Sequence, residues 1–243
     1  MGQRIAALAL QDSGMKLAAG LEAKGHALIG RDLGDVLGAA RLGIAVTDDA
    51  EAALRSADIL IDFTRPEPTM EHVQVARRLR RGIVIGTTGF SDAQQTAIRD
   101  AAKEIPVLLS PNMSVGVNLL FELVQTAARR LGLRYDVEIV EAHHRAKQDA
   151  PSGTAKRLAQ AAADGRGQQP QDVPVHAIRA GDIVGDHTVL FAGPFERLEL
   201  THRAHGRDAF AIGALSAARF LRGQRAGLYD MSHVLQGGTH ATA

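Results

Sequence analysis

The sequence has no cysteine and no tryptophan among its 243 residues, and aromatic residues make up only 4% of it. Without cysteine, disulfide bonds, thiolate nucleophiles and cysteine-ligated metal sites are excluded. Net charge is also nearly absent, because 28 Lys and Arg stand against 27 Asp and Glu. A chain this close to neutrality is not expected to depend on nucleic acid or on a membrane surface as its partner.

Long apolar runs are missing as well. No segment approaches the ~20 apolar residues of a membrane-spanning helix, and the opening MGQRIAALAL lacks the charged-then-apolar order of a secretory signal. We therefore expect a soluble, cytoplasmic protein. The length suffices for one large domain or two smaller ones, each with a proper core.

In the first half of the chain, short apolar runs alternate with helix-forming segments. The expected strands are 4–10, 26–30, 43–47, 58–63, 82–86 and 106–110, and the expected helices are 15–23, 48–56, 71–80 and 91–104. This alternation predicts an α/β fold with a Rossmann-like, doubly wound parallel sheet.

The pattern changes after Asn112. A long apolar helix is expected at 115–131, followed by strands that end near 141 and then strands at 175–179, 187–192 and 198–204. Successive strands predict a second, α+β domain with a mixed or antiparallel sheet. The apolar helix at 210–221 would return the chain to the first domain. We expect a first domain of residues 1–113 and 214–243 and a second of residues 114–213.

Most of the readable chemistry lies between Glu141 and Ala159, in the segment EAHHRAKQDAPSGTAKRLA. Two adjacent histidines end an alternating strand, and a lysine follows within four residues. Ser152 or Thr154 can cap the helix that comes next, whose free N–H groups suit a carboxylate or a phosphate. The simpler alternative is a strand-loop-helix connection with surface histidines.

This segment resembles the signature E-x-HH-x-x-K-x-D-A-P-S-G-T-A of the 4-hydroxy-tetrahydrodipicolinate reductases, also called dihydrodipicolinate reductases, of bacterial lysine and diaminopimelate synthesis. The resemblance implies that His143 is the proton donor and Lys147 its partner general acid. It also implies that His144, Gly153 and Thr154 bind the carboxylates of a small cyclic dicarboxylate substrate.

Further blocks resemble the same family along nearly the whole chain: IDFT, VIGTTGF, SPNMSVGVNL, GDIVGDHTVLF, ERLELTH and GLYDM. The resemblance implies a nicotinamide cofactor, NADPH or NADH, and a homotetramer that packs through the second domains. The residues that would face the nicotinamide are Gly86, Thr87, Thr88, Ser110, Pro111, Asn112 and Met113. Taken alone, Gly86-Thr87-Thr88 is also compatible with ordinary turn chemistry.

One cofactor landmark is missing where we expect it. The glycine-rich turn that holds a pyrophosphate is expected right after the first strand, at Ala9–Met15, but side chains there and the carboxylate of Asp12 oppose a close approach. The acidic residue that would bind the ribose is either Asp32 or Asp35. Two functions therefore stay open: an NAD(P)H-dependent reductase, or a relative that has lost the dinucleotide and acts as a dehydratase, an isomerase or a non-catalytic partner.

Three further histidines, His187, His202 and His205, could suggest a metal site together with His143 and His144. Their spacing matches no helical metal-ligand motif, and cysteine is absent. We expect packing or surface roles for them and no bound metal.

Overall fold

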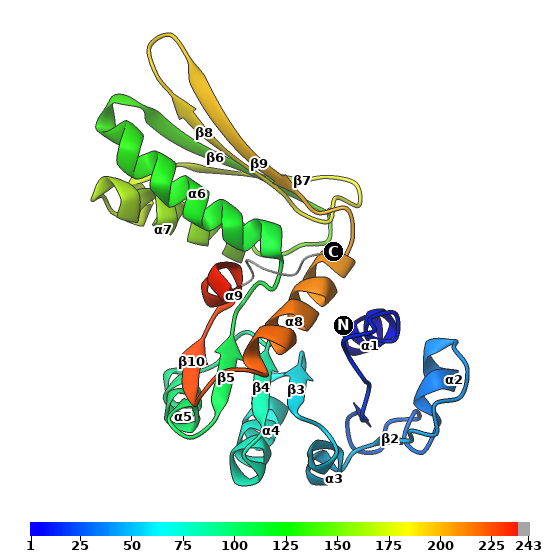
Figure 1. The fold of residues 1–243 in the computed structure, drawn as a ribbon. Helices are drawn as coiled ribbons and strands as arrows, with labels where there is room; N and C mark the ends of the chain where they lie inside the picture. Colours follow the sequence, from blue (N-terminus) through cyan, green and yellow to red (C-terminus); the bar gives the residue numbers. More distant parts are fainter. Residues whose placement is uncertain (238–243) are drawn as a thin grey trace. The chain divides into compact units, whose positions relative to one another are not determined.

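The computed structural model describes residues 1–237. The chain divides into two compact units, one formed by Met1–Met113 together with the segment that starts at Phe210, and the other by Ser114–Ala209 (Figure 1). The first unit contains an all-parallel sheet and the second a mixed sheet, each with helices packed on it. The predicted fold class is confirmed.

The first unit is built on a four-stranded sheet in the order β10-β5-β4-β3, with every neighbouring pair parallel. Its strands are β3 (Ile59–Asp62), β4 (Gly82–Ile85), β5 (Pro106–Leu109) and β10 (Gly227–Tyr229), and its helices are α1 (Gly2–Ala9), α2 (Leu33–Leu37), α3 (Ala50–Arg55), α4 (Pro66–Leu79), α5 (Asp92–Ala102), α8 (Asp208–Leu221) and α9 (Met231–Gly237). Every residue of β4 is buried, as expected for a strand with helices on both faces of its sheet. Leu54, Val73 and Ile98 bring α3, α4 and α5 into one core cluster with Ile83 and Ile85.

The first expected strand is wrong. Residues 4–10 lie mostly in α1 (Gly2–Ala9), which buries Ile5 and Ala9, four residues apart on one helical face. A short apolar run cannot be assigned to strand or helix by hydrophobicity alone. Three alanines among these residues favour the helix, because alanine has the highest helix propensity.

The next two expected elements are wrong as well. Residues 15–23 were expected to be helical, yet they hold only the two-residue strand β1 (Gly20–Leu21), which pairs in parallel with β2 (Val46–Thr47) in a separate small sheet. The expected strand 26–30 is a series of turns. Gly25 and Gly30 have φ values of 79° and 82°, which interrupt a regular strand at both ends of this stretch.

The second unit is a four-stranded sheet in the order β7-β6-β8-β9. Its elements are α6 (Val115–Leu131), η1 (Gly132–Arg134), β6 (Asp136–His143), α7 (Gly153–Arg166), η2 (Pro170–Asp172), β7 (Val175–Arg179), β8 (Asp186–Ala192) and β9 (Arg197–Arg203). The central strand β6 runs parallel to β7 and antiparallel to β8. Figure 1 shows α6 and α7 side by side on one face of this sheet.

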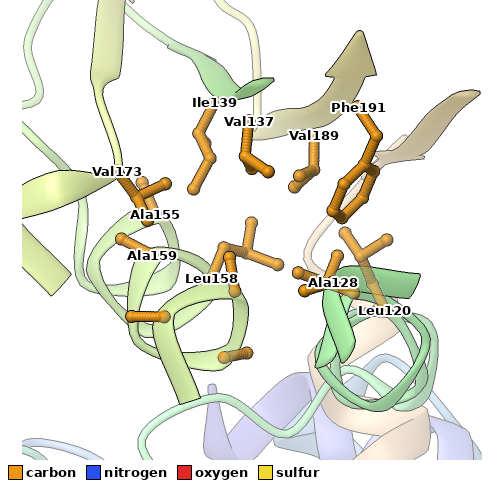
Figure 2. Packing of buried hydrophobic residues seen from close by; sticks show 14 residues of the cluster. Leu120, Ala128, Val137, Ile139, Ala155, Leu158, Ala159, Val173, Val189 and Phe191 are labelled. Atoms are coloured by element: carbon orange, nitrogen blue, oxygen red, sulfur yellow. The ribbon is translucent and has the colours of Figure 1, made fainter. Parts of the chain in front are cut away.

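The core of the second unit fills the space between the sheet and these two helices. Val137, Ile139 and Phe191 point from the strands toward Leu158 of α7 and Leu120 of α6 (Figure 2). Along β6 every second residue is buried, which places Glu141 and His143 on the same inner face as this apolar core. Two polar side chains at the end of an apolar face need partners, and these partners form the candidate site.

Among residues 1–237, no helix is both long enough and apolar enough to cross a bilayer.

Candidate active site

Glu141 and His143 lie at the carboxyl end of β6. The Nδ1 atom of His143 is 2.5 Å from Oε2 of Glu141, and neither side chain is more than one-tenth exposed. Because a carboxylate only accepts hydrogen bonds, Nδ1 carries the hydrogen of this contact. The Nε2 atom is therefore the ring nitrogen left for a ligand.

Arg179, at the end of β7, neutralises this buried carboxylate. Its two terminal nitrogens donate to both oxygens of Glu141, each at 2.8 Å. The β6–β7 register explains the contact, since His143 pairs with Arg179 across the two strands. Arg179 also donates to the backbone oxygens of Lys147 and Asp149, so it ties the loop after β6 to the buried carboxylate.

Ser152 and His187 close the network on its other side. The Ser152 N–H donates to Oε1 of Glu141 at 3.0 Å, and its hydroxyl caps α7 by accepting from the Ala155 N–H. The same hydroxyl lies 3.2 Å from Nε2 of His187, which pairs with Glu141 across β6 and β8. The rings of His143 and His187 meet edge to face with their centroids 5.1 Å apart.

The two buried groups differ in charge. Burial alone would raise the pKa of Glu141, but the hydrogen bonds from Arg179, His143 and the Ser152 N–H outweigh it and lower that pKa to about 2. Burial lowers the pKa of His187 to about 4, and repulsion from His143 adds to this effect. At neutral pH the site therefore holds a carboxylate at Glu141 and an uncharged imidazole at His187.

Lys147 and His144 lie on the loop that follows β6. The Lys147 ammonium pairs with Asp149 at 2.7 Å, whereas the His143 ring pairs with Glu141, and Arg179 connects the two pairs. His144 lines an open depression of about 510 Å³, together with Arg145, Ala146, Gly181 and Asp182. The loop thus presents a cation and an imidazole within a few residues of each other.

Gly153 and Thr154 form the first two positions of α7, directly after the Ser152 cap. Amides at a helix start point out of the helix, and the helix dipole favours negative charge there. Gly153 is exposed, and a Cβ added to it would meet nothing within 4 Å. The expected carboxylate-binding residues therefore lie on the two segments that flank the buried network, the loop after β6 and the start of α7.

The residues expected to face a nicotinamide lie in the first unit, at the carboxyl ends of β4 and β5. Gly86, Thr87 and Thr88 follow β4, and only Thr88 of the three is exposed. A Cβ on Gly86 would lie 2.3 Å from the Phe63 ring, so glycine is needed there for packing. Backbone groups and an exposed hydroxyl at this edge are the usual ligand contacts of an open parallel sheet.

The second expected cofactor segment follows β5. Ser110 is buried and its hydroxyl closes the turn by donating to the Asn112 backbone oxygen at 2.8 Å. Pro111 is exposed, whereas Met113 is 1% exposed and belongs to the core. Ser110 and Met113 therefore shape this turn, and Pro111 and Asn112 form the part that a ligand could contact.

A polar network that the sequence did not suggest lies at the same edge. Asp62, at the end of β3, is 2% exposed and pairs with His72 of α4 at 2.7 Å. Its other oxygen accepts from the Thr64 hydroxyl, and the Thr87 hydroxyl is bound to that of Thr69 at 3.0 Å. The hydrogen bond between Thr87 and Thr69 thus helps to hold the turn after β4 in place. Nothing in the spacing of these residues marked them as neighbours.

The residues compared with a glycine-rich turn are placed differently from our expectation. Ala9 ends α1 and Asp12–Gly14 forms the turns after it, so Ala9–Met15 is not a strand-to-helix connection. Asp32 caps α2 and accepts from the backbone N–H groups of Gly34, Leu42 and Gly43. The expected strand-to-helix turn is therefore not formed at Ala9–Met15, because the residues before it belong to α1 and not to a strand of the parallel sheet.

His187 and His202 pair across β8 and β9. Within the part of the chain that the structure describes, no group of three or more side chains is arranged to hold a metal ion.

Comparison with known proteins shows the family of the chain. The family model described as "Dihydrodipicolinate reductase, N-terminus" matches residues 1–113, and that described as "Dihydrodipicolinate reductase, C-terminus" matches residues 116–235. The chain belongs to the dihydrodipicolinate reductase family. Membership extends over both units, so the family resemblance inferred from the sequence motifs is confirmed.

Individual relatives are similar over nearly their full length. The 4-hydroxy-tetrahydrodipicolinate reductase of Aromatoleum aromaticum is 47% identical, with 97% of this chain and 91% of the relative covered. The reductase of Ralstonia nicotianae is also 47% identical, with 97% and 95% covered. A solved structure, the dipicolinate-bound dihydrodipicolinate reductase from Paenisporosarcina sp. TG-14, matches with a TM-score of 0.77 at 26% identity, covering 94% of this chain and 92% of that one.

Proposed function

We propose that this protein reduces 4-hydroxy-tetrahydrodipicolinate to tetrahydrodipicolinate with NADPH or NADH, in the synthesis of diaminopimelate and lysine. The observation that carries the proposal is the match of both units to one reductase family, whose motif at Glu141–Ala159 forms an ordered site here. The alternative of a dehydratase, an isomerase or a non-catalytic partner is not favoured. Relatives that are 47% identical over 97% of this chain are named 4-hydroxy-tetrahydrodipicolinate reductases, and both family models are of that reductase.

The first unit offers groups that fit the nicotinamide half of a dinucleotide. Its parallel sheet ends in the turns at Gly86–Thr88 and Ser110–Met113, where exposed backbone and the Thr88 hydroxyl are available. We assign cofactor binding to the domain of residues 1–113 and 214–243, and substrate binding, catalysis and oligomerisation to residues 114–213. The reduced nicotinamide, when bound, supplies a hydride.

The residues of the second unit handle the proton. Loss of water from the hydroxylated substrate first gives a conjugated cyclic imine. Reduction of this imine at a ring carbon moves an electron pair to the ring nitrogen, and the resulting enamine takes a proton on the neighbouring carbon. Nε2 of His143 is the atom that can deliver this proton, because Nδ1 is occupied by Glu141. Lys147 stabilises the negative charge that develops on the substrate or relays the proton.

The two carboxylates of the substrate need positive or hydrogen-donating partners. His144 and the N–H groups of Gly153 and Thr154, at the start of α7, provide them. Neither His144 nor these N–H groups need a metal ion to bind a carboxylate. The diacid would thus be held by backbone amides whose geometry is fixed by the Ser152 cap.

A direct assay tests the function. Purified protein is titrated with NADPH and with NADH, and freshly generated substrate is then added while the absorbance of the reduced nucleotide is followed. Saturable nucleotide binding and a substrate-dependent fall in absorbance are expected. Substrate consumption without nucleotide oxidation would instead establish the dehydratase or isomerase, and no consumption at all would establish the non-catalytic alternative.

Substitution of the two acids tests the residue roles. His143→Ala and Lys147→Ala should each lower kcat by about two to four powers of ten, the usual contribution of a general acid. His144→Ala should mainly raise the Michaelis constant for the diacid, because it removes a binding contact. Wild-type turnover in both His143→Ala and Lys147→Ala would refute the assigned proton chemistry.

We also propose that the protein is a cytoplasmic homotetramer assembled through its second domains. The sheet of the second unit has its helices on one face only, and the other face carries apolar side chains such as Val140, Ile178 and Leu190. A partly apolar sheet face in a lone chain is suited to packing against a second copy.

A further inference from the structure

The buried carboxylate of Glu141 has no part in the proton transfer proposed above, and it does not reach solvent, with 0% of its side chain exposed. Burying a charge is costly unless it is fully paired. Here the two oxygens receive four donors: Nδ1 of His143, both terminal nitrogens of Arg179, and the Ser152 N–H. Such complete pairing of one carboxylate indicates that Glu141 holds the surrounding side chains in place.

We propose that Glu141 and Arg179 form a positioning pair for the two acids of the reaction. Glu141 holds the imidazole of His143 with its hydrogen on Nδ1, so that Nε2 is the working nitrogen. Arg179 holds Glu141 and, through the backbone oxygens of Lys147 and Asp149, the loop that carries the ammonium. The inference rests on the proposed role of His143 as proton donor.

The surroundings of Nε2 fit this assignment. Gly185 precedes β8, and a Cβ added to it would lie 3.1 Å from Nε2 and 3.4 Å from Cδ2 of His143. Because position 185 has no side chain, the space beside Nε2 of His143 stays open, while Glu141 lies beside Nδ1 on the other edge of the ring. His187, edge to face with the ring at 5.1 Å, is a third constraint on its orientation.

Chemistry explains why an acceptor-only group stands at position 141. A glutamine has the same shape, but one of its two terminal atoms is an N–H₂ donor. In place of Oε1, this N–H₂ group would face two other donors, the Ser152 N–H and Arg179, and neither of them can become an acceptor. At the Oε2 position it would face Arg179 and Nδ1 of His143, and the imidazole can respond by moving its hydrogen to Nε2. Glu141→Gln is therefore expected to reverse the tautomer of His143.

The test combines kinetics with nitrogen NMR of the histidine rings. Glu141→Gln should lower kcat at least about tenfold while the Michaelis constant for the nucleotide stays unchanged, in line with the large losses that follow when a buried carboxylate partner of a catalytic histidine is neutralised. The ¹⁵N spectrum, with His143 assigned by comparison with His143→Gln, should show the neutral-ring hydrogen on Nδ1 in the wild type and on Nε2 in the variant.

Glu104→Gln provides the matched control. Glu104 also accepts from an arginine, Arg77, but in the first unit and at a partly exposed position. This variant should keep the wild-type kcat and the wild-type tautomer of His143. If Glu141→Gln does not fold, the double variant Glu141→Gln/Arg179→Gln removes both charges together, and the same kinetic and spectral changes are expected of it.

The outcomes separate this inference from the proposed function. Wild-type kcat in the folded Glu141 variant, or an Nδ1 hydrogen retained there, would overturn the positioning role even if His143→Ala is inactive. Full activity of His143→Ala would overturn the proton-donor assignment itself, and with it the proposed function of the pair.

Discussion

Two imidazoles that touch each other have opposite electrostatic surroundings. His143 is hydrogen-bonded to the carboxylate of Glu141, whereas the ring nitrogen Nε2 of His187 lies beside the Ser152 hydroxyl and its Nδ1 has no hydrogen-bond partner within residues 1–237. His187 is 3% exposed, so protonation would place an unpaired charge in the interior next to the His143 ring. This explains why the pKa of His187 is lowered, first by burial and then by His143.

His187 should make the fold sensitive to mild acid. Its pKa is about 4 in the folded chain, against 6.5 for a histidine side chain in water, so the unfolded chain binds more protons between these values. The free energy of unfolding should be highest above about pH 6.5 and fall by up to roughly 3 kcal/mol as the pH approaches 4. Urea unfolding at a series of pH values measures this slope.

His187→Gln should reduce that slope, since glutamine does not titrate, while the same change at the exposed His26 should leave it as in the wild type. The window from pH 6.5 to 4.5 excludes Glu141, because its lowered pKa, about 2, affects stability only below 4.5. His202, whose pKa is also lowered by burial, contributes to the slope equally in the wild type and in the variant. An unchanged slope in His187→Gln would contradict the assignment of a buried neutral imidazole.

The sequence indicated some members of this site and not others. His143, His144 and Lys147 stand together in one segment, so their proximity was predictable. Glu141 and His143 have the spacing of one strand face, but Arg179 and His187 reach them only through the pairing registers of β6 with β7 and β8. No short-range pattern contains those registers, which are set by packing of the whole unit.

At the level of elements, the predictions succeeded where two signals agreed. α6 and β7 have the expected bounds, Val115–Leu131 and Val175–Arg179. α6 has an apolar face, a Ser114 cap and a glycine after its end, and these local cues require no tertiary information. α1 and β1 lacked such agreement, since β1 depends on its pairing with β2.

The contact between α6 and α7 should be intolerant of even one methyl group. A Cβ on Gly165 of α7 would lie 2.5 Å from the backbone oxygen of Gln125 and 2.8 Å from Cβ of Ala128, both on α6. Gly→Ala within a helix normally stabilises by about 0.5–1 kcal/mol. Here Gly165→Ala forces the helices apart, so we expect a loss of about 1–3 kcal/mol in the free energy of unfolding.

Urea denaturation of Gly165→Ala checks this expectation. Gly206→Ala is a suitable control, because its Cβ would meet only the Asp208 backbone nitrogen, at 4.0 Å. A stabilised Gly165→Ala protein would show that the two helices are not in close contact in solution.

At the scale of the whole molecule, the division into two units follows from the change of pattern near residue 113. Alternating strands and helices predict a parallel sheet, and successive strands after a long helix predict a mixed or antiparallel one. The sequence could therefore predict both architectures, including the return of the chain after the second unit. The sequence does not contain the number of chains in the proposed assembly, because that number depends on how the surfaces of separate copies fit together.

The proposed tetramer requires that the helix-free face of the second unit's sheet be buried between subunits. Ile178 of β7 is 47% exposed in the single chain and lies opposite Ala142 of β6 on the face without helices. In a lone chain, Ile178→Glu would place a charge in water at little cost, but in a sheet-to-sheet interface it would bury an unpaired carboxylate. Light scattering should give four chains of 25.8 kDa for the wild type and smaller particles for Ile178→Glu. Leu133→Glu, a change at a residue 68% exposed outside the sheet, should keep the wild-type mass. A monomeric wild type, or an Ile178→Glu variant that retains the full assembly, would mean that this sheet face stays in water and that subunits, if they associate, use another surface.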